Sequence, residues 1–145
     1  MDYLNDPQFL RQLIMDHYEF PRHKEYHEDY KRIQMSTDSC IDDLTIQAKL
    51  VGNRLVDVCF IGDACTIATS SASMMCDLLH GKTVQEALYL IDQFNKMLKL
   101  ESFDEKSLGE LVALQNVGKQ PHRITCANLA WRGIELLVKE DAKNE

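Results

Sequence analysis

The chain has 145 residues, 45% of them hydrophobic, and a formal net charge of −7 at pH 7. A chain of this length can bury a sizeable core without disulfides, so we expect a single domain over residues 1–145. The acidic balance argues against nucleic acid or an anionic membrane surface as the main partner, and no apolar run approaches the roughly 18 residues that a membrane span needs.

The five cysteines indicate an intracellular, cytoplasmic protein. Their number is odd, and the first residues, Met-Asp-Tyr-Leu-Asn-Asp, lack the basic and apolar regions of a signal peptide. In a reducing compartment, grouped cysteines usually serve metal or thiol chemistry rather than disulfides.

The first predicted helix begins at Asp6-Pro7, where aspartate can act as the N-cap and proline as the first helical residue. Apolar side chains then recur at helical spacing as far as Tyr18, and Pro21 is expected to end the helix. The polar residues 22–32 are expected to form a loop that leads into a short strand near residues 32–35.

A β-hairpin is predicted next. Residues 44–50 alternate between apolar and polar, Gly52-Asn53 is typical of a type II′ turn, and residues 55–61 form the return strand. Antiparallel pairing would bring Cys40 and Cys65 to the same end of the sheet, although they lie 25 positions apart in the sequence.

The rest of the chain is predicted to be helical. Capping-box patterns at Thr83–Glu86 and Ser107–Glu110 each predict the start of a helix. The expected helices are residues 66–79 with Gly81 after the last turn, 84 to about 98, a short one through 114, and a final helix after Pro121. Together these elements predict an α+β fold in which several α-helices cover a small three-stranded antiparallel sheet.

Three cysteines lie where ordered segments are expected to begin or end: Cys40, Cys65 and Cys126. Asp42 follows Cys40 by two positions, so the two side chains would point to the same side of an extended segment, whereas Asp43 would point away. Three thiolates and one carboxylate suit tetrahedral Zn²⁺, an iron–sulfur cluster, or sulfur carried on a reactive cysteine. The residues alone leave these three alternatives open.

The surroundings of these cysteines favour ionised thiols. Cys65 is expected to open one helix and Cys126 to lie near the start of another, where the free N–H groups lower a thiol pKa. Arg123 could support a thiolate or persulfide, or pair with a surface acid, and we favour the first. His122 is a weaker candidate for a metal or substrate contact. The remaining cysteines, Cys59 and Cys76, are expected to be core residues, and so is His17.

Four segments carry a family resemblance: Met-Asp-His-Tyr-Glu-Phe-Pro-Arg at 15–22, Cys-Ile-Asp at 40–42, Gly-Asp-Ala-Cys-Thr-Ile at 62–67 with Ser-Ser-Ala-Ser-Met-Met at 70–75, and Arg-Ile-Thr-Cys-Ala-Asn-Leu-Ala-Trp at 123–131. With these, the chain resembles the NifU-like, IscU-type scaffold proteins of iron–sulfur cluster assembly over nearly its whole length. Two features favour the SufU branch. Thr125 stands where IscU-type proteins carry a histidine, and residues 100–115 leave room for an additional segment.

The resemblance implies a SufE/NifU-like fold and a Zn²⁺ site formed by Cys40, Asp42, Cys65 and Cys126. It further implies that Cys40 leaves the zinc and accepts a persulfide sulfur, and that Arg123 matches a family arginine. The sulfur donor would be a SufS-type cysteine desulfurase, to which the pyridoxal phosphate belongs, and sulfur would pass on to downstream iron–sulfur assembly proteins. The chain would then be a sulfurtransferase-type accessory protein rather than a stand-alone enzyme.

Two alternatives remain open beside this reading. The same residues could assemble a [2Fe–2S] cluster, or the domain could be a structural zinc adaptor. The sequence also departs from the family pattern, because Ile41 replaces the usual glycine and Asp38-Ser39 replaces the frequent Asn-Pro. A β-branched residue stiffens the loop, so we expect Ile41 to slow the exchange of Cys40.

Overall fold

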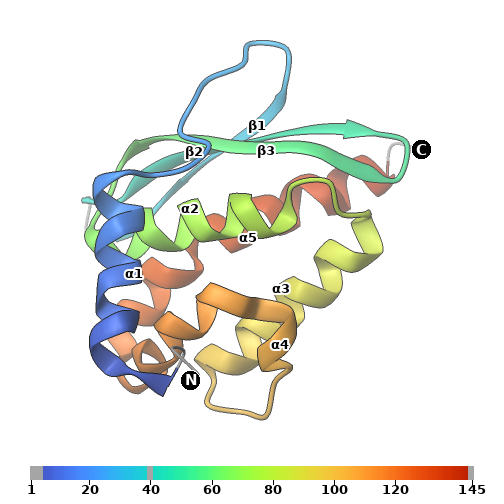
Figure 1. Ribbon diagram of the computed structural model, residues 1–145. Coiled ribbons are helices and arrows are strands. Elements are labelled where there is room, and N and C mark those ends of the chain that lie inside the picture. Colours follow the sequence, from blue (N-terminus) through green and yellow to red (C-terminus); the bar gives the residue numbers. More distant parts are fainter. Residues whose placement is uncertain (1–4, 39–40, 144–145) are drawn as a thin grey trace.

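The computed structural model describes residues 5–38 and 41–143 (Figure 1). Its elements, in chain order, are α1 (Pro7–Glu19), β1 (Lys31–Ser36), β2 (Asp43–Val51), β3 (Arg54–Asp63), α2 (Thr66–Leu79), α3 (Val84–Leu98), α4 (Glu105–Leu108), the 3₁₀ helix η2 (Gly109–Lys119) and α5 (Pro121–Lys143). The strands form one antiparallel sheet in the order β1-β2-β3. Helices α2 and α5 lie along one face of it, and α3 and α4 lie farther from it (Figure 1). The predicted α+β fold is confirmed.

The hairpin of β2 and β3 has the predicted turn. Ile46 pairs with Phe60, and both are fully buried. Gly52 has a φ of 60°, which a type II′ turn requires at its first central position. On the covered face, a Cβ added to Gly133 would lie 2.9 Å from Ile46, so glycine lets α5 approach the sheet closely.

Helix α2 lies at the centre of the molecule, and nearly all of its residues are buried. Its small side chains allow close packing, and the hydroxyl groups are used in hydrogen bonds. Ser71 Oγ donates to the Ala127 carbonyl at 2.6 Å and accepts from Trp131 Nε1 at 3.1 Å. These two bonds fix α5, which carries Cys126, against α2, which follows Cys65.

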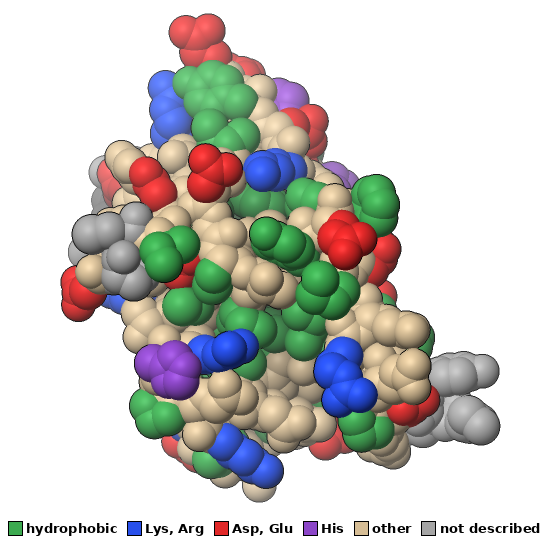
Figure 2. All heavy atoms as spheres, turned by 90° about the vertical axis from the view of Figure 1, so that its left-hand side faces the viewer, with side chains coloured by type: hydrophobic (Ala, Val, Ile, Leu, Met, Phe, Trp, Pro, Cys, Tyr) green, Lys and Arg blue, Asp and Glu red, His purple; other side chains and the backbone are tan. Residues whose placement is uncertain are grey.

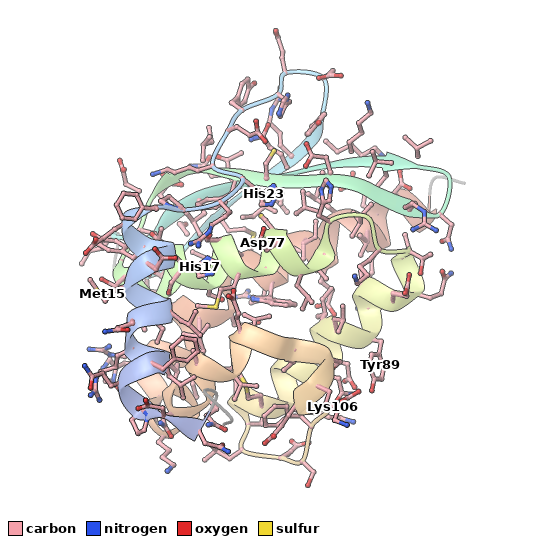
Figure 3. The ribbon with its side chains drawn as sticks, in the orientation of Figure 1. Met15, His17, His23, Asp77, Tyr89 and Lys106 are labelled. Carbon is pink, nitrogen blue, oxygen red and sulfur yellow. The ribbon has the colours of Figure 1, made fainter. Side chains whose placement is uncertain are left out.

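His17 joins α1 to the rest of the protein, as the sequence predicts for a satisfied core residue. Its ring is buried and points from α1 toward α2 (Figure 3). Nδ1 lies 2.8 Å from Ser73 Oγ, and Nε2 lies 2.9 Å from Glu110 Oε2. Ser73 Oγ also accepts from the backbone N–H of Arg22, so this network fixes the chain as it leaves α1.

The second predicted capping box, at Ser107–Glu110, is wrong. The N-cap in this region is Asp104, whose carboxylate accepts from the Ser107 N–H, and α4 begins at Glu105. Gly109 has a φ of 54°, which interrupts the helix where the predicted one would begin, and the chain continues as η2. The Asp104 carboxylate, and not the Ser107 hydroxyl, is therefore the group that caps the helix.

The other face of the sheet is partly covered by the loop between α1 and β1, which rises above it in Figure 1. Gln47 is fully buried beneath this loop, accepting from the His27 N–H and donating to the Glu25 carbonyl. Lys24 forms a parallel bridge with Phe60 of β3. Within the described residues, every helix is too short or too polar to cross a membrane.

Candidate metal centre

Asp42, Cys65 and Cys126 converge at one end of the sheet. Asp42 immediately precedes β2, Cys65 immediately precedes α2, and Cys126 lies in the second turn of α5. One ligand atom from each lies within 4.8 Å of the other two. Cys40, the fourth residue of the predicted site, lies outside the described residues. Three of the four predicted ligands, far apart in the sequence, are thus neighbours in the fold.

The Asp42 carboxylate is held in place by the backbone. Asp42 is only 1% exposed, whereas the adjacent Asp43 is exposed and its carboxylate accepts from Gln34 Nε2. Asp42 Oδ1 accepts from the Cys65 N–H at 2.7 Å, and Oδ2 lies 3.7 Å from Cys65 Sγ. The alternation in the sequence therefore distinguished the inward-facing aspartate from the outward-facing one.

Cys65 is the N-cap residue of α2. Its backbone is extended, and its Sγ accepts from the Ala68 N–H at 3.4 Å. The Ala68 N–H is one of the first-turn N–H groups that have no partner within the helix, so the sulfur takes the place of a capping oxygen. The predicted position of Cys65 at a helix start is confirmed, and the helix itself contributes to its chemistry.

For Cys126, the prediction of a lowered thiol pKa is wrong. Cys126 is the sixth residue of α5, and its Sγ is 3.9 Å from the His122 carbonyl, which accepts from the thiol. Burial, hydrogen bonding with Asp42 and the adjacent Cys65 raise the pKa of Cys126 to about 12. In the metal-free protein this thiol is protonated at neutral pH, so a metal ion that binds here must displace a proton.

A cleft of about 400 Å³ opens beside these three residues. It is lined by Ile41, Asp42, Cys65, Thr66, Ile67, His122, Arg123 and Cys126. Arg123 and His122, both singled out in the sequence, thus lie at the cleft, as does Ile41, which is 68% exposed. Thr66 and Ile67, which were not among the predicted site residues, also line the cleft, and their positions directly after Cys65 were the signal for it.

The donor set fits Zn²⁺. With usual Zn–S and Zn–O bond lengths, a sulfur and an oxygen at two corners of a tetrahedron lie about 3.5 Å apart. The 3.7 Å between Cys65 Sγ and Asp42 Oδ2 is close to that separation. Cysteine thiolates are equally the usual ligands of iron–sulfur clusters, so the donor set suits both groups.

Cys59 and Cys76 take no part in this centre. Both are fully buried, and burial raises the pKa of Cys59 to about 12 and that of Cys76 well above its usual range. The four described cysteines are free thiols. The prediction that Cys59 and Cys76 are packing residues agrees with their burial.

The centre lies on the left-hand end of the molecule in Figure 1, the face that Figure 2 shows. Over the middle of this face hydrophobic side chains gather, with charged side chains around them (Figure 2). Large hydrophobic residues are exposed on α1, directly after it and in the loop before β2. They include Met15, Tyr18, Phe20 and Ile41.

Residues 10–136 match the family described as the NifU-like N-terminal domain. The chain belongs to this family. The resemblance inferred from the sequence is therefore confirmed, and it spans all three residues of the centre that the structure describes.

Two relatives are similar over most of the NifU-like chain. The zinc-dependent sulfurtransferase SufU of Bacillus subtilis is 38% identical over 136 residues, covering 92% of each chain. The iron–sulfur cluster assembly scaffold protein IscU of Streptococcus pyogenes is 35% identical over 131 residues, covering 90% of this chain and 82% of the relative.

One solved structure is also similar to this chain. A crystal structure from Fervidobacterium islandicum AW-1 is described as a SUF-system iron–sulfur cluster assembly scaffold protein. It superimposes with a TM-score of 0.82 at 31% identity, covering 86% of this chain and 93% of that one.

Proposed function

We propose that this protein is a zinc-dependent sulfur acceptor that serves a SufS-type cysteine desulfurase in iron–sulfur cluster assembly. The observation that carries the proposal is the convergence of Asp42, Cys65 and Cys126 beside an open cleft. Similarity to a relative named a zinc-dependent sulfurtransferase supports it.

The ligands would be Asp42, Cys65 and Cys126, with Cys40 as the fourth. When bound, Zn²⁺ keeps the thiols deprotonated without changing oxidation state. Cys65 and Cys126 are anchored by α2 and α5, which Ser71 holds together. Asp42 is oriented by the Cys65 N–H, and a carboxylate is a weaker partner for Zn²⁺ than a thiolate, so the donor set favours ligand exchange.

Cys40 would be the sulfur acceptor, next to exposed Ile41 at the cleft. Its thiolate attacks the outer sulfur of a persulfide on the desulfurase. A sulfur–sulfur bond forms on Cys40, the bond in the donor persulfide breaks, and the donor cysteine leaves as a thiolate, so no external oxidant is needed. Arg123, at the same cleft, would support the resulting persulfide anion through its fixed positive charge.

The desulfurase would supply the pyridoxal phosphate and dock at the face of Figure 2, over whose middle hydrophobic side chains gather. Ile41 is the apolar side chain closest in sequence to the sulfur acceptor, and it is available for contact. From Cys40 the sulfur would pass to downstream iron–sulfur assembly proteins.

The decisive experiment uses a Cys40→Ser variant and a SufS-type desulfurase supplied with cysteine. We expect the variant to lose its stimulation of sulfide release and to gain no sulfur atom by mass spectrometry of the intact protein. The matched control is Thr125→Ser, an equally small change beside Cys126. Full stimulation by Cys40→Ser would exclude the sulfur-acceptor role and favour a structural zinc adaptor.

A second candidate function is a scaffold for a [2Fe–2S] cluster on the same residues. The relative from Streptococcus pyogenes, named an assembly scaffold, favours it. Metal analysis and visible spectra of protein purified with and without air separate the two. Stoichiometric iron with cluster absorbance in the anaerobic protein would favour the scaffold, whereas one colourless zinc ion in both preparations favours sulfur transfer.

A further inference from the structure

A second cluster of metal-ligand side chains lies at the opposite end of α2. His23 comes from the loop after α1, Asp57 from β3, and His80 from the residue that follows α2, and one ligand atom of each lies within 4.8 Å of the others. Cys65 precedes this helix of 14 residues, whose length is about 21 Å. The cluster is therefore separate from the thiol cleft.

Asp57 is positioned as a ligand by a neighbouring tyrosine. Its Oδ2 accepts from the Tyr30 hydroxyl at 2.7 Å, while Oδ1 lies 3.5 Å from His80 Nδ1. The Asp57 side chain is only 18% exposed. One carboxylate oxygen is thus fixed by a hydrogen bond, and the other is directed at an imidazole nitrogen at a distance that two ligands of one metal ion can have.

His23 is held in a similar way. Its Nε2 lies 2.9 Å from Asp77 Oδ1, and Figure 3 shows His23 close to Asp77 on α2. The ring centroids of His23 and His80 are 5.6 Å apart. The His23 carbonyl accepts from the Phe60 N–H, which fixes its backbone to β3. Metal-binding histidines commonly donate their second N–H to a carboxylate, and Asp77 offers that partner while Nδ1 remains for an ion.

Two neighbouring groups are less suited to a metal ion. His27 and Cys59 also lie near Asp57, but Cys59 is fully buried and burial raises the pKa of its thiol to about 12. His17 lies near Asp77 and Glu110, but both of its ring nitrogens already have partners. Among these three groups, only the cluster of His23, Asp57 and His80 combines two nitrogen donors with access from solvent. The His80 side chain is 52% exposed.

We propose that His23, Asp57 and His80 bind one divalent first-row transition metal ion, with Asp77 as the residue that orients His23. Two imidazole nitrogens and one carboxylate oxygen favour Zn²⁺, Co²⁺, Ni²⁺ or Cu²⁺ over Mg²⁺ and Ca²⁺, which prefer oxygen ligands alone. Water would complete the coordination on the side of His80. This site does not depend on the function proposed for the thiol cleft.

Co²⁺ is the probe that distinguishes the two sites. Protein as purified is titrated with Co²⁺ and followed by its absorption spectrum and by metal analysis after gel filtration. We expect one equivalent of cobalt with visible d–d bands and no sulfur-to-cobalt charge-transfer band in the near ultraviolet. If the thiol cleft lacks zinc, an additional equivalent appears there with that band, so the outcome at one site does not obscure the other.

Three variants complete the test. His80→Ala, a change at an exposed side chain, is expected to abolish the nitrogen-and-oxygen site, and Asp77→Asn to weaken it by about 10–100-fold. Glu101→Ala, which removes an exposed carboxylate outside both metal centres, should leave it unchanged, and circular dichroism checks that each variant is folded. In protein whose thiol cleft is loaded with zinc, absence of the d–d signal in the wild type, or its persistence in folded His80→Ala, would overturn the proposal.

Discussion

The backbone N–H of Cys65 donates a 2.7 Å hydrogen bond to Oδ1 of Asp42. This bond joins the residue that precedes β2 to the residue that precedes α2, so the hairpin and the start of α2 share one buried carboxylate. The same aspartate therefore has a structural role that is independent of its proposed role as a metal ligand.

The structural role of Asp42 predicts that Asp42→Ala destabilises the metal-free protein by about 1–3 kcal/mol, because the Cys65 N–H loses its acceptor. Urea denaturation in the presence of a chelator measures this. The matched control is Asp43→Ala, an exposed neighbour whose loss should change the free energy of unfolding by less than about 0.5 kcal/mol. Equal effects of the two substitutions would contradict the assignment.

Replacement of either anchoring cysteine should remove the metal. We expect Cys65→Ala and Cys126→Ala to lose stoichiometric zinc and to lower the Tm of the metal-loaded protein, because binding energy at such a centre contributes to folding. Zinc analysis and thermal unfolding with and without chelator provide the measurement. Thr125→Ala, exposed and adjacent to Cys126, serves as the control. Full zinc content with an unchanged Tm in the cysteine variants would refute the ligand assignment.

Ile41 should control how quickly the site opens. Ile41→Gly is expected to accelerate zinc transfer to a chelator, because glycine frees the loop, while stability changes little at a residue that is 68% exposed. Ile41→Val retains the β-branch and should behave like the wild type. If both variants release zinc at the wild-type rate, backbone stiffness at this position does not limit exchange.

The buried thiols Cys59 and Cys76 should not react with a thiol reagent at pH 8 until the protein unfolds. Burial raises the pKa of both thiols. Their contribution to stability is present in full below pH about 8.5, the usual thiol pKa, and is lost as pH rises above it, because the unfolded state releases these protons first. Mass spectrometry of alkylated peptides identifies the reactive cysteines. Rapid native labelling of Cys76 would contradict its burial.

Substitution of Gly62 is expected to destabilise the protein more than substitution of Gly52, although both glycines have positive φ angles. A Cβ at Gly62 would lie 2.1 Å from the Asp43 carbonyl oxygen, whereas the space at Gly52 is open. Gly62→Ala should therefore lower the free energy of unfolding by about 2–4 kcal/mol, and Gly52→Ala by about 1 kcal/mol. Chemical denaturation of the two variants compares them. A smaller effect at Gly62 would mean that the strand end can shift.

The sequence by itself determined the local structure and the family. Period-two alternation, the Asp6-Pro7 start and the Thr83–Glu86 capping box predicted elements that the structure contains, because these signals act over a few neighbouring residues. The Ser107 prediction was wrong because two short capping patterns overlapped and only local geometry, with Asp104 and Gly109, selected between them.

Only the tertiary structure decided which side chains meet. Cys126 and Asp42 come together because α5 packs against α2 through Ser71, a contact between residues more than fifty positions apart. The same holds for His23, Asp57 and His80, which no motif connects. Local patterns determine helices and strands through short-range backbone preferences, whereas the distance between ligands depends on how the core packs the elements together.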